Sequence, residues 1–367
     1  MADAFSWGSG MVQNVGMTVV QPAGVDREVV DFAVVGSWME EQGLPGGEFE
    51  EVVALGGGTQ NVMLRFRRGG RDYVLRRGPK HLRPKSNDVI RREARLLGAL
   101  AGTDVRAPRV IAACADESVL GAVFYLMEPI TGFNPQTELP PLYAADADLR
   151  RRMGLSAVEA IARLGSVDYV ALGLTDYGKP DGFLERQVPR WLSELESYAA
   201  NDGYPGPEIP GVRRVGDWLE RHRPLEWSPG ILHGDCHLAN VMFHYDRPEV
   251  AALVDWEMST IGDPLLDLGW QLATRSEPGT AGAGLFGKLG EVGGLPTAEE
   301  MIAEYGRFSD RDLGHVTWYT VLACFKLGIV LEGTHARAFA GKAPKRVGEF
   351  LHAITLELFE QANGLIE

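Results

Sequence analysis

Two carboxylates and one amide follow one another within a short stretch of the chain, in an order suited to phosphoryl transfer. Asp235 ends the triplet HGD, Asn240 follows it, and Asp255 begins the triplet DWE. Carboxylate and amide oxygens are suitable ligands for a hard cation such as Mg²⁺. In the phosphoryl-transfer template, one Asp accepts the proton of the acceptor hydroxyl, while an Asn and a second Asp hold the metal. We therefore predict that Asp235 is the catalytic base and that Asn240 and Asp255 bind Mg²⁺.

The surrounding sequence predicts a β-hairpin that brings these residues together. Its apolar strands, Val241–Phe243 and Val250–Val254, are joined by the turn YDRP. This pairing puts Asn240 and Asp255 at neighbouring strand ends, with Asp235 in the loop before the first strand. The alternative is that HGD is an ordinary turn and that the other two residues only cap strands. The further pattern GDPLLDL shortly after DWE favours the catalytic interpretation.

A glycine-rich turn predicts a phosphate-binding hairpin near the start of the chain. The strands Val52–Leu55 and Val62–Phe66 flank the sequence GGGTQN, which includes Gly57, Gly58 and Thr59. Glycines allow backbone N–H groups to approach nucleotide phosphates, as in the glycine-rich hairpin of kinases. The stretch is not a P-loop, because no GKS or GKT follows. An ordinary hairpin turn is the alternative.

The next predicted strand, Asp72–Arg76, carries arginine where kinases carry the lysine that holds the α- and β-phosphates. We assign that role to Arg76. Its expected acidic partner is Glu93, on the predicted helix Lys85–Leu100. The exchange matters because a guanidinium is a planar, bidentate clamp and an ammonium is a compact point charge. In the alternative interpretation, Arg76 and Arg77 are solvated strand charges.

The motifs HGDCHLAN and DWE resemble those of the aminoglycoside phosphotransferase and choline kinase superfamily, over nearly the whole chain from about Val29. More narrowly, DWE, GDP and the late segment EGTHARA look like the phosphotransferase-like domain fused to some acyl-CoA dehydrogenases. Those domains also have arginine at the position of Arg76. The resemblance implies that main-chain groups of Glu128 and Ile130 bind adenine, with ATP and Mg²⁺ as cofactors.

The fold implied by the resemblance is α+β, a protein-kinase-like bilobal fold. It has a small antiparallel-sheet N-lobe over residues 26–130 and a mostly helical C-lobe over residues 131–367, after a disordered lead over residues 1–25. Periodicity and turn residues predict a first helix over Asp26–Gln42 with Asp26 as its N-cap. Further strands are predicted over Pro108–Cys114 and Val119–Met127. The later helices are expected at residues 147–167, 188–200, 212–223, 298–305, 310–332 and 344–363.

Composition limits the class of protein. The net charge is −14 over 367 residues, which argues against nucleic-acid binding through phosphate neutralisation. Cysteines at 114, 236 and 324 are widely spaced without a CxxC pair, which favours a reducing cytoplasm. Met1–Gln21 lacks the pattern of a secretory signal. No uninterrupted apolar run reaches the roughly 18 residues of a membrane-spanning helix.

These features predict an ATP- and Mg²⁺-dependent small-molecule phosphotransferase that moves the γ-phosphoryl group to a substrate hydroxyl. A hydroxyacyl-CoA or an aminoglycoside-like alcohol is the expected acceptor. A nucleotide-binding regulatory pseudokinase is one alternative, and thiol chemistry at Cys236 is another, although no His/Asn relay is recognisable around it. His233 is expected to brace the catalytic loop, and Asp267 to accept hydrogen bonds from its backbone. Glu257 and the oligomeric state are left unassigned.

Overall fold

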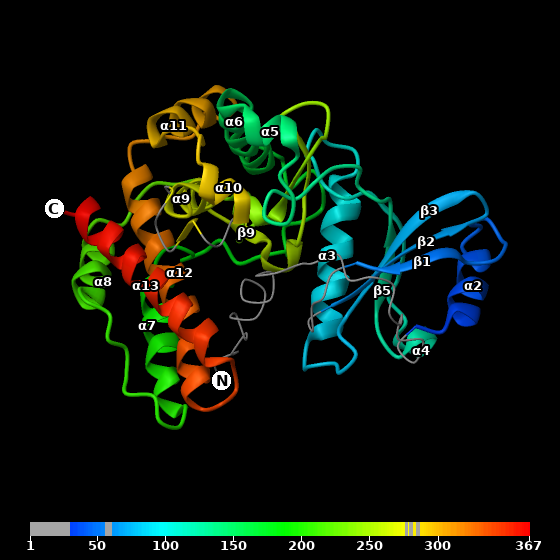
Figure 1. The fold of residues 1–367 in the computed structure, drawn as a ribbon, viewed down its shortest axis with the longest axis horizontal. Helices are drawn as coiled ribbons and strands as arrows, with labels where there is room; N and C mark the ends of the chain where they lie inside the picture. The colour runs from blue at the N-terminus through cyan, green and yellow to red at the C-terminus, as the bar shows by residue number, and fades with distance from the viewer. Residues whose placement is uncertain (1–29, 56–60, 276–277, 279–281, 284–286) are drawn as a thin grey trace. The chain divides into compact units, whose positions relative to one another are not determined.

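The computed structural model describes residues 30–55, 61–275, 278, 282–283 and 287–367. Its contacts divide the chain into two compact units (Figure 1). The smaller unit consists of the described residues up to Thr131 together with Ala251–Glu257. The larger unit consists of Gly132–Val250 and Met258–Glu367.

The smaller unit is built on a five-stranded antiparallel sheet in the order β1-β2-β3-β5-β4. The strands are β1 (Glu50–Ala54), β2 (Val62–Arg68), β3 (Arg71–Arg77), β4 (Val110–Cys114) and β5 (Phe124–Met127). Gly69 and Gly70 both have positive φ and make the tight turn that pairs Arg68 with Arg71. This register places Arg76 opposite Met63 on one side and Tyr125 on the other. The predicted antiparallel sheet is confirmed.

One helix supplies much of the apolar core of this sheet. Helix α2 (Phe32–Glu41) begins where the Asp31 carboxylate accepts hydrogen bonds from the first free amides of the helix. Asp31, not the predicted Asp26, is therefore its N-cap. The core formed with strands β2, β3 and β5 contains Val35, Trp38, Met39, Leu64, Phe66, Tyr73, Phe124 and Leu126. Burial of this surface fixes the sheet that carries Arg76.

Helix α3 (Ser86–Leu100) contacts β4 and β5 and carries Glu93 on its buried side. The predicted strand Val119–Met127 is wrong over its first residues. There the chain forms the short helix α4 (Glu117–Leu120), capped by Asp116 and ended by Gly121 at a φ of 68°. Local capping outweighs the strand propensity of that segment, because the cap satisfies the first free N–H groups of the helix.

The larger unit is mostly helical, as predicted. Its longer helices are α6 (Ala147–Gly165), α7 (Gln187–Ser197), α8 (Val212–Arg221), α9 (Leu265–Ala273), α11 (Ala298–Arg307), α12 (Val316–Phe339) and α13 (Lys345–Leu365). Short helices occur at α5 (Pro141–Ala145) and α10 (Gly287–Val292). Helix α12 contacts α7, α8, α9 and α13, and is therefore surrounded by other helices.

Helix α12 starts later and ends later than the predicted 310–332. The amide of Gly314 donates to the side chain of Asp312, which holds the preceding segment as a turn. By length and mean hydropathy, α12 is the one helix among the described residues that could cross a membrane, but 94% of the apolar window is buried. The sequence analysis looked for an uninterrupted run of apolar residues, which α12 lacks. Helix α12 meets the membrane criterion through the average hydropathy of an 18-residue window. Such burial is typical of a core helix.

Two small sheets frame the loop that carries the predicted catalytic residues. Strand β6 (Gly230–Leu232) pairs antiparallel with β9 (Thr260–Gly262), and β7 (Val241–Phe243) pairs with β8 (Val250–Leu253), which confirms the predicted hairpin. Strand β8 crosses the boundary between the units. Ala251–Glu257 groups with the smaller unit, whereas the sequence assigned it to the C-lobe. The amide of Leu253 donates to the carbonyl of Arg106, which is one of the contacts that join this segment to the smaller unit.

Candidate active site

The HGD triplet forms a sharp loop between β6 and the short helix η2 (Leu238–Asn240). Gly234 has a φ of 85°, a conformation that favours glycine. A Cβ at this position would lie 2.4 Å from the carbonyl oxygen of Met258. The loop therefore requires a glycine for two reasons, its backbone angle and its close packing.

Asp267, in the first turn of α9, anchors this loop from behind. Its carboxylate accepts hydrogen bonds from the amides of His233, at 2.6 Å, and Gly234, at 2.8 Å. Asp267 is only 1% exposed, and burial raises its pKa to about 6 against the opposing effect of these two bonds. The predicted role of Asp267 is confirmed. Asp267 thus fixes the backbone of His233, and the bracing role of the His233 side chain stays a prediction.

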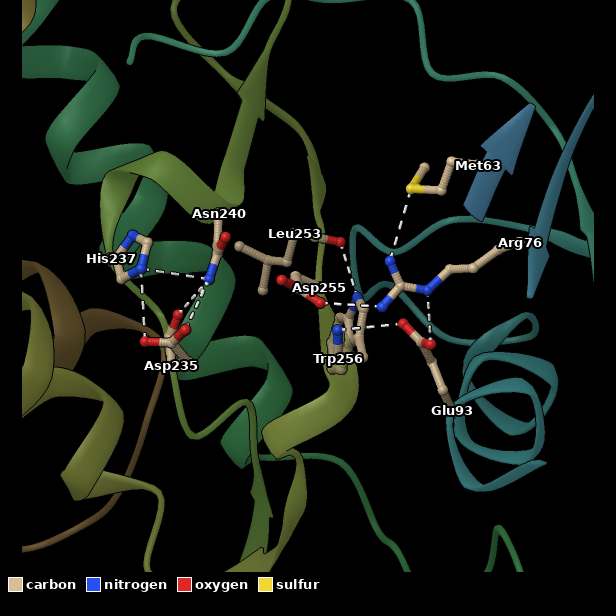
Figure 2. A network of polar contacts seen from close by, with 9 residues as sticks. All are labelled: Met63, Arg76, Glu93, Asp235, His237, Asn240, Leu253, Asp255 and Trp256. Atoms are coloured by element: carbon tan, nitrogen blue, oxygen red, sulfur yellow. Dashed lines mark hydrogen bonds and ion pairs between the residues drawn. The ribbon is translucent and has the colours of Figure 1, made fainter. Parts of the chain in front are cut away.

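Asp235 and Asn240 form one hydrogen-bonded group within the larger unit (Figure 2). The side-chain nitrogen Nδ2 of Asn240 donates to the carboxylate of Asp235 at 3.1 Å and to the main-chain carbonyl of Asp235 at 2.9 Å. The ring of His237 lies 3.5 Å from the other carboxylate oxygen. Burial acts to raise the pKa of Asp235, but His237 and His233 reverse this effect and hold the pKa below its usual value. Asp235 is therefore ionised at neutral pH.

A buried lysine that the sequence reasoning missed supports the same loop. The ammonium of Lys326 on α12 donates to the carbonyl of Gly234 at 3.1 Å and lies over the ring of Trp270, 4.4 Å from its centroid. Burial lowers its pKa to about 8, while Asp235 and Asp267 act in the opposite direction. The sequence signal was a single lysine within a long apolar helix, since such a charge rarely enters a core without a partner.

In the smaller unit, Arg76 joins two acidic groups that are distant in sequence (Figure 2). Its guanidinium lies 2.8 Å from Glu93 and 3.0 Å from Asp255. Burial disfavours the charge of Arg76, but Glu93, Tyr125 and Asp255 outweigh it and raise the pKa well above the usual value. The predicted pairing of Arg76 with Glu93 is confirmed. The alternative of solvated arginines is wrong, because Arg76 and Arg77 are 6% and 5% exposed.

Asp255 adopts a left-handed backbone conformation, with a φ of 66°. Aspartate is among the few non-glycine residues found there, and the surrounding structure must hold it in place. The next amide, that of Trp256, donates to Glu93 at 3.3 Å, and the indole of Trp256 donates to the carbonyl of Leu253 at 2.8 Å. Glu93 therefore fixes Asp255 both through Arg76 and through the neighbouring backbone.

The remaining predicted nucleotide contacts are only partly described. Gly57, Gly58 and Thr59 lie outside the described residues. Glu128 follows β5, where its amide donates to the carbonyl of Arg109 and its side chain lies 2.9 Å from Arg71. An adenine contact at this segment would therefore use the carbonyl of Glu128 and the amide of Ile130.

The thiol of Cys236 is unsuited to nucleophilic chemistry. It is 0% exposed, and burial raises its pKa well above the usual value. The side-chain amide of Gln271 donates to its sulfur at 3.6 Å. Reactive cysteines have lowered pKa values and accessible sulfur atoms, so the environment of Cys236 is typical of a structural residue.

Comparison with known proteins agrees with this fold and these motifs. A candidate aminoglycoside phosphotransferase from Ralstonia eutropha JMP134 superposes with a TM-score of 0.74 at 29% identity, over 91% of this chain and 98% of that one. The GDP complex of aminoglycoside 2'-phosphotransferase-IIIa has a TM-score of 0.60 at 16% identity, over 89% and 97% of the two chains, and shows the fold alone. The architecture is thus that of the kinase-like aminoglycoside phosphotransferases.

The model of the Phosphotransferase enzyme family matches residues 51–301, so the chain belongs to that family. It is also similar to acyl-CoA dehydrogenase family member 11 of Homo sapiens, at 32% identity over 290 residues. That match covers 77% of this chain and 36% of the relative. Acyl-CoA dehydrogenase family member 10 of Mus musculus is 28% identical, over 85% of this chain and 29% of the relative. The chain therefore spans about a third of the length of these curated relatives.

Proposed function

We propose that this chain is an ATP- and Mg²⁺-dependent kinase that transfers the γ-phosphoryl group to a hydroxyl of a small molecule. The observation that carries the proposal is the hydrogen bond from the side chain of Asn240 to the carboxylate of Asp235, in a loop whose backbone Asp267 anchors. Asp235 takes the proton of the acceptor hydroxyl while the acceptor oxygen bonds to phosphorus and the bond to ADP breaks. Catalysis of this kind consists mainly of positioning and charge stabilisation.

Asn240 and Asp255 are the proposed ligands of Mg²⁺, which when bound neutralises charge on the phosphates. Their amide and carboxylate oxygens match the preference of this cation. Asn240 directs its nitrogen to Asp235, so its oxygen is the atom that would contact the metal. Because Asp235 and Asn240 belong to one unit and Asp255 to the other, their convergence on one ion stays a prediction.

For the nucleotide, Arg76 is the proposed clamp of the α- and β-phosphates, oriented by Glu93. The bond between these two side chains supports this role, because it directs a permanent cation from a buried strand. The backbone of Gly57, Gly58 and Thr59 would contact phosphate, and main-chain groups of Glu128 and Ile130 would bind adenine.

For the acceptor, we propose a hydroxyacyl-CoA or an aminoglycoside-like alcohol. Two relatives are named as acyl-CoA dehydrogenase family members, which supports the first class. One structural neighbour is a ternary complex of aminoglycoside phosphotransferase APH(4)-Ia with ADP and hygromycin B, which supports the second. The three cysteines are free thiols, which fits the reducing cytoplasm that we propose as the compartment.

One observation favours the alternative, a nucleotide-binding regulator without transfer activity. Arg76 lies 3.0 Å from a carboxylate oxygen of Asp255, so a cation already occupies one side of a proposed metal ligand. If Mg²⁺ cannot displace or share this contact, nucleotide binding would persist without transfer. The presence of Asp235, Asn240 and Asp255 together argues for the active kinase, because these are the three residues that the phosphoryl-transfer template requires.

The test is ADP release with ATP and Mg²⁺ over a panel of CoA thioesters bearing hydroxyl groups, aminoglycosides, choline, homoserine and sugars. We expect at least one acceptor to stimulate ADP release, and Asp235→Asn to lower kcat by about 10²- to 10⁴-fold. The matched control is Asp246→Asn, which removes an exposed carboxylate from the turn after β7 and should leave kcat unchanged.

Thermal unfolding with ATP and Mg²⁺ separates the two functions. Saturation at 100 times Kd stabilises a protein by about 2.7 kcal/mol, so both functions predict a higher Tm. Stabilisation without ADP release from any acceptor would favour the regulator. Stabilisation neither by ATP nor by GTP would rule out both.

A further inference from the structure

A second polar cluster lies in the larger unit, between helices α12 and α13. It consists of Glu332 and His335 on α12 and His352 on α13. One ligand atom from each residue lies within 4.8 Å of the other two. Glu332 is fully buried, at 0% exposure, and neither the proposed kinase function nor the Asp235 group uses these residues.

Helix geometry brings these three residues together. Glu332 and His335 are three positions apart on α12, so their side chains lie on the same face. Helix α13 approaches that face closely at two glycines. A Cβ at Gly348 would lie 2.6 Å from the Cβ of Ala338, and one at Gly328 would lie 2.7 Å from the ring of Phe359. This close approach places His352 beside the two residues of α12.

The three side chains of the cluster contact one another and a tyrosine. Glu332 accepts a hydrogen bond from the hydroxyl of Tyr204 at 2.6 Å through one oxygen, and its other oxygen lies 2.6 Å from Nδ1 of His352. The rings of His335 and His352 stack with centroids 4.3 Å apart.

We propose that Glu332, His335 and His352 bind a divalent cation of the zinc class, with a water molecule as the fourth ligand. Two imidazoles and one carboxylate form a known three-residue zinc set that keeps an open position. The hydroxyl of Tyr204 orients the carboxylate from behind, as hydrogen-bonding partners of metal ligands commonly do. The nitrogen ligands disfavour Mg²⁺, which prefers oxygen. The ion would fasten α12, the helix that carries Lys326, to α13.

The experiment measures Zn²⁺ binding by the full chain after treatment with EDTA, by calorimetry and without nucleotide. Co²⁺ serves as the spectroscopic probe, since its visible absorption reports nitrogen ligands and a low coordination number. We expect one equivalent of Zn²⁺ to bind and to raise Tm by about 5 °C at saturation. Mg²⁺ at the same concentration should not reproduce the shift.

Two variants and two controls assign the site. Glu332→Gln and His352→Gln should each lower the Zn²⁺ affinity at least tenfold and abolish the Co²⁺ spectrum. His352 is partly exposed, so its variant keeps the test valid if Glu332→Gln does not fold. His222→Ala removes an exposed histidine at the end of α8, and Asp235→Asn alters the candidate active site. Both controls should bind Zn²⁺ normally.

Equal Zn²⁺ binding by the wild type and both cluster variants would overturn the proposal, because the ion would then be held elsewhere. Absence of Zn²⁺ binding by the wild type would also overturn it, and would leave Glu332 as a buried acid paired with a histidine. Loss of binding in Asp235→Asn alone would move the ion to the loop of the HGD triplet. These outcomes are independent of whether the chain transfers phosphate.

Discussion

In the larger unit, the aspartate of the HGD triplet contacts an amide side chain and a histidine, whereas in the smaller unit Asp255 contacts an arginine. Asp235 bonds to the amide of Asn240, and its loop is fixed by two backbone amides that donate to Asp267. Asp255 instead receives the guanidinium of Arg76. Both aspartates are partly exposed, and each depends on a buried ionisable residue: Asp235 on Asp267 and Asp255 on Arg76.

The difference lies in how the buried group is compensated. Asp267 is satisfied by hydrogen bonds from a loop that cannot move away without losing them, so the geometry of Asp235 depends on backbone contacts. Arg76 and Glu93 compensate one another by charge, and breaking such a buried pair leaves one ion without its partner. The loop of the larger unit should therefore respond mainly to changes in shape and pH, and the Arg76 network to changes in charge.

The largest expected loss of kcat follows substitution of the proposed metal ligands, Asn240 in the larger unit and Asp255 in the smaller unit. Asn240→Ala and Asp255→Ala should each lower kcat by about 10²- to 10³-fold, as removal of one stabilising group does elsewhere. If both residues bind one Mg²⁺, the double variant should lose little more than the worse single variant, because the effects of coupled residues do not add. The measurement is ADP release as a function of Mg²⁺ concentration. Fully additive losses would show that the two residues act separately.

Arg76→Met tests the charged network alone. The change leaves the buried Glu93 without its cationic partner, and we expect a loss of about 3–5 kcal/mol in the free energy of unfolding. Urea unfolding measures this loss. Arg65→Met is the matched control, because Arg65 is on the neighbouring strand, is half exposed and pairs with Asp72 at 3.6 Å, a contact worth little. Equal losses of unfolding free energy in Arg76→Met and Arg65→Met would show that the burial of Arg76 does not determine its contribution to stability.

Lys326→Met tests the loop of the larger unit through pH. The folded pKa of Lys326, about 8, lies below the ordinary 10.5, so the unfolded chain binds more protons between these values. Stability due to this group therefore rises with pH across that window. Relative to Lys326→Met, the wild type should gain roughly 3 kcal/mol between pH 8 and 10.5. Urea unfolding at several pH values measures it, and parallel curves would contradict a buried ammonium.

Cys236→Ala should have the smallest effect. The thiol is buried next to Asp235 in sequence but has no suitable environment for a nucleophile, so kcat should stay unchanged. Loss of the buried sulfur should cost about 1 kcal/mol in the free energy of unfolding. Both quantities can be measured on the same preparation used for the other variants. Loss of ADP release by a correctly folded Cys236→Ala variant would instead support the alternative in which the Cys236 thiol takes part in the chemistry.

Much of the architecture could be predicted because its causes are local. Alternating apolar residues and the Gly69-Gly70 turn define the antiparallel strands, and the order of the motifs HGD, DWE and GDP identifies the family. The pairing of Arg76 with Glu93 followed from the kinase template and is observed. The predicted ends of helices and strands were less accurate. The N-cap of the first helix and the strand at Val119 were misplaced, because local capping bonds outweighed periodicity.

The sequence by itself determined the chemistry available to this chain, since residue types and their spacing decide which groups can accept a proton or bind a cation. Tertiary structure alone revealed Lys326 beneath the loop of the HGD triplet and the meeting of Glu332, His335 and His352. The physical reason is that burial and close helix packing depend on residues far apart in the chain. A lone lysine in an apolar helix acquires a role only when the fold supplies a carbonyl for it to bind.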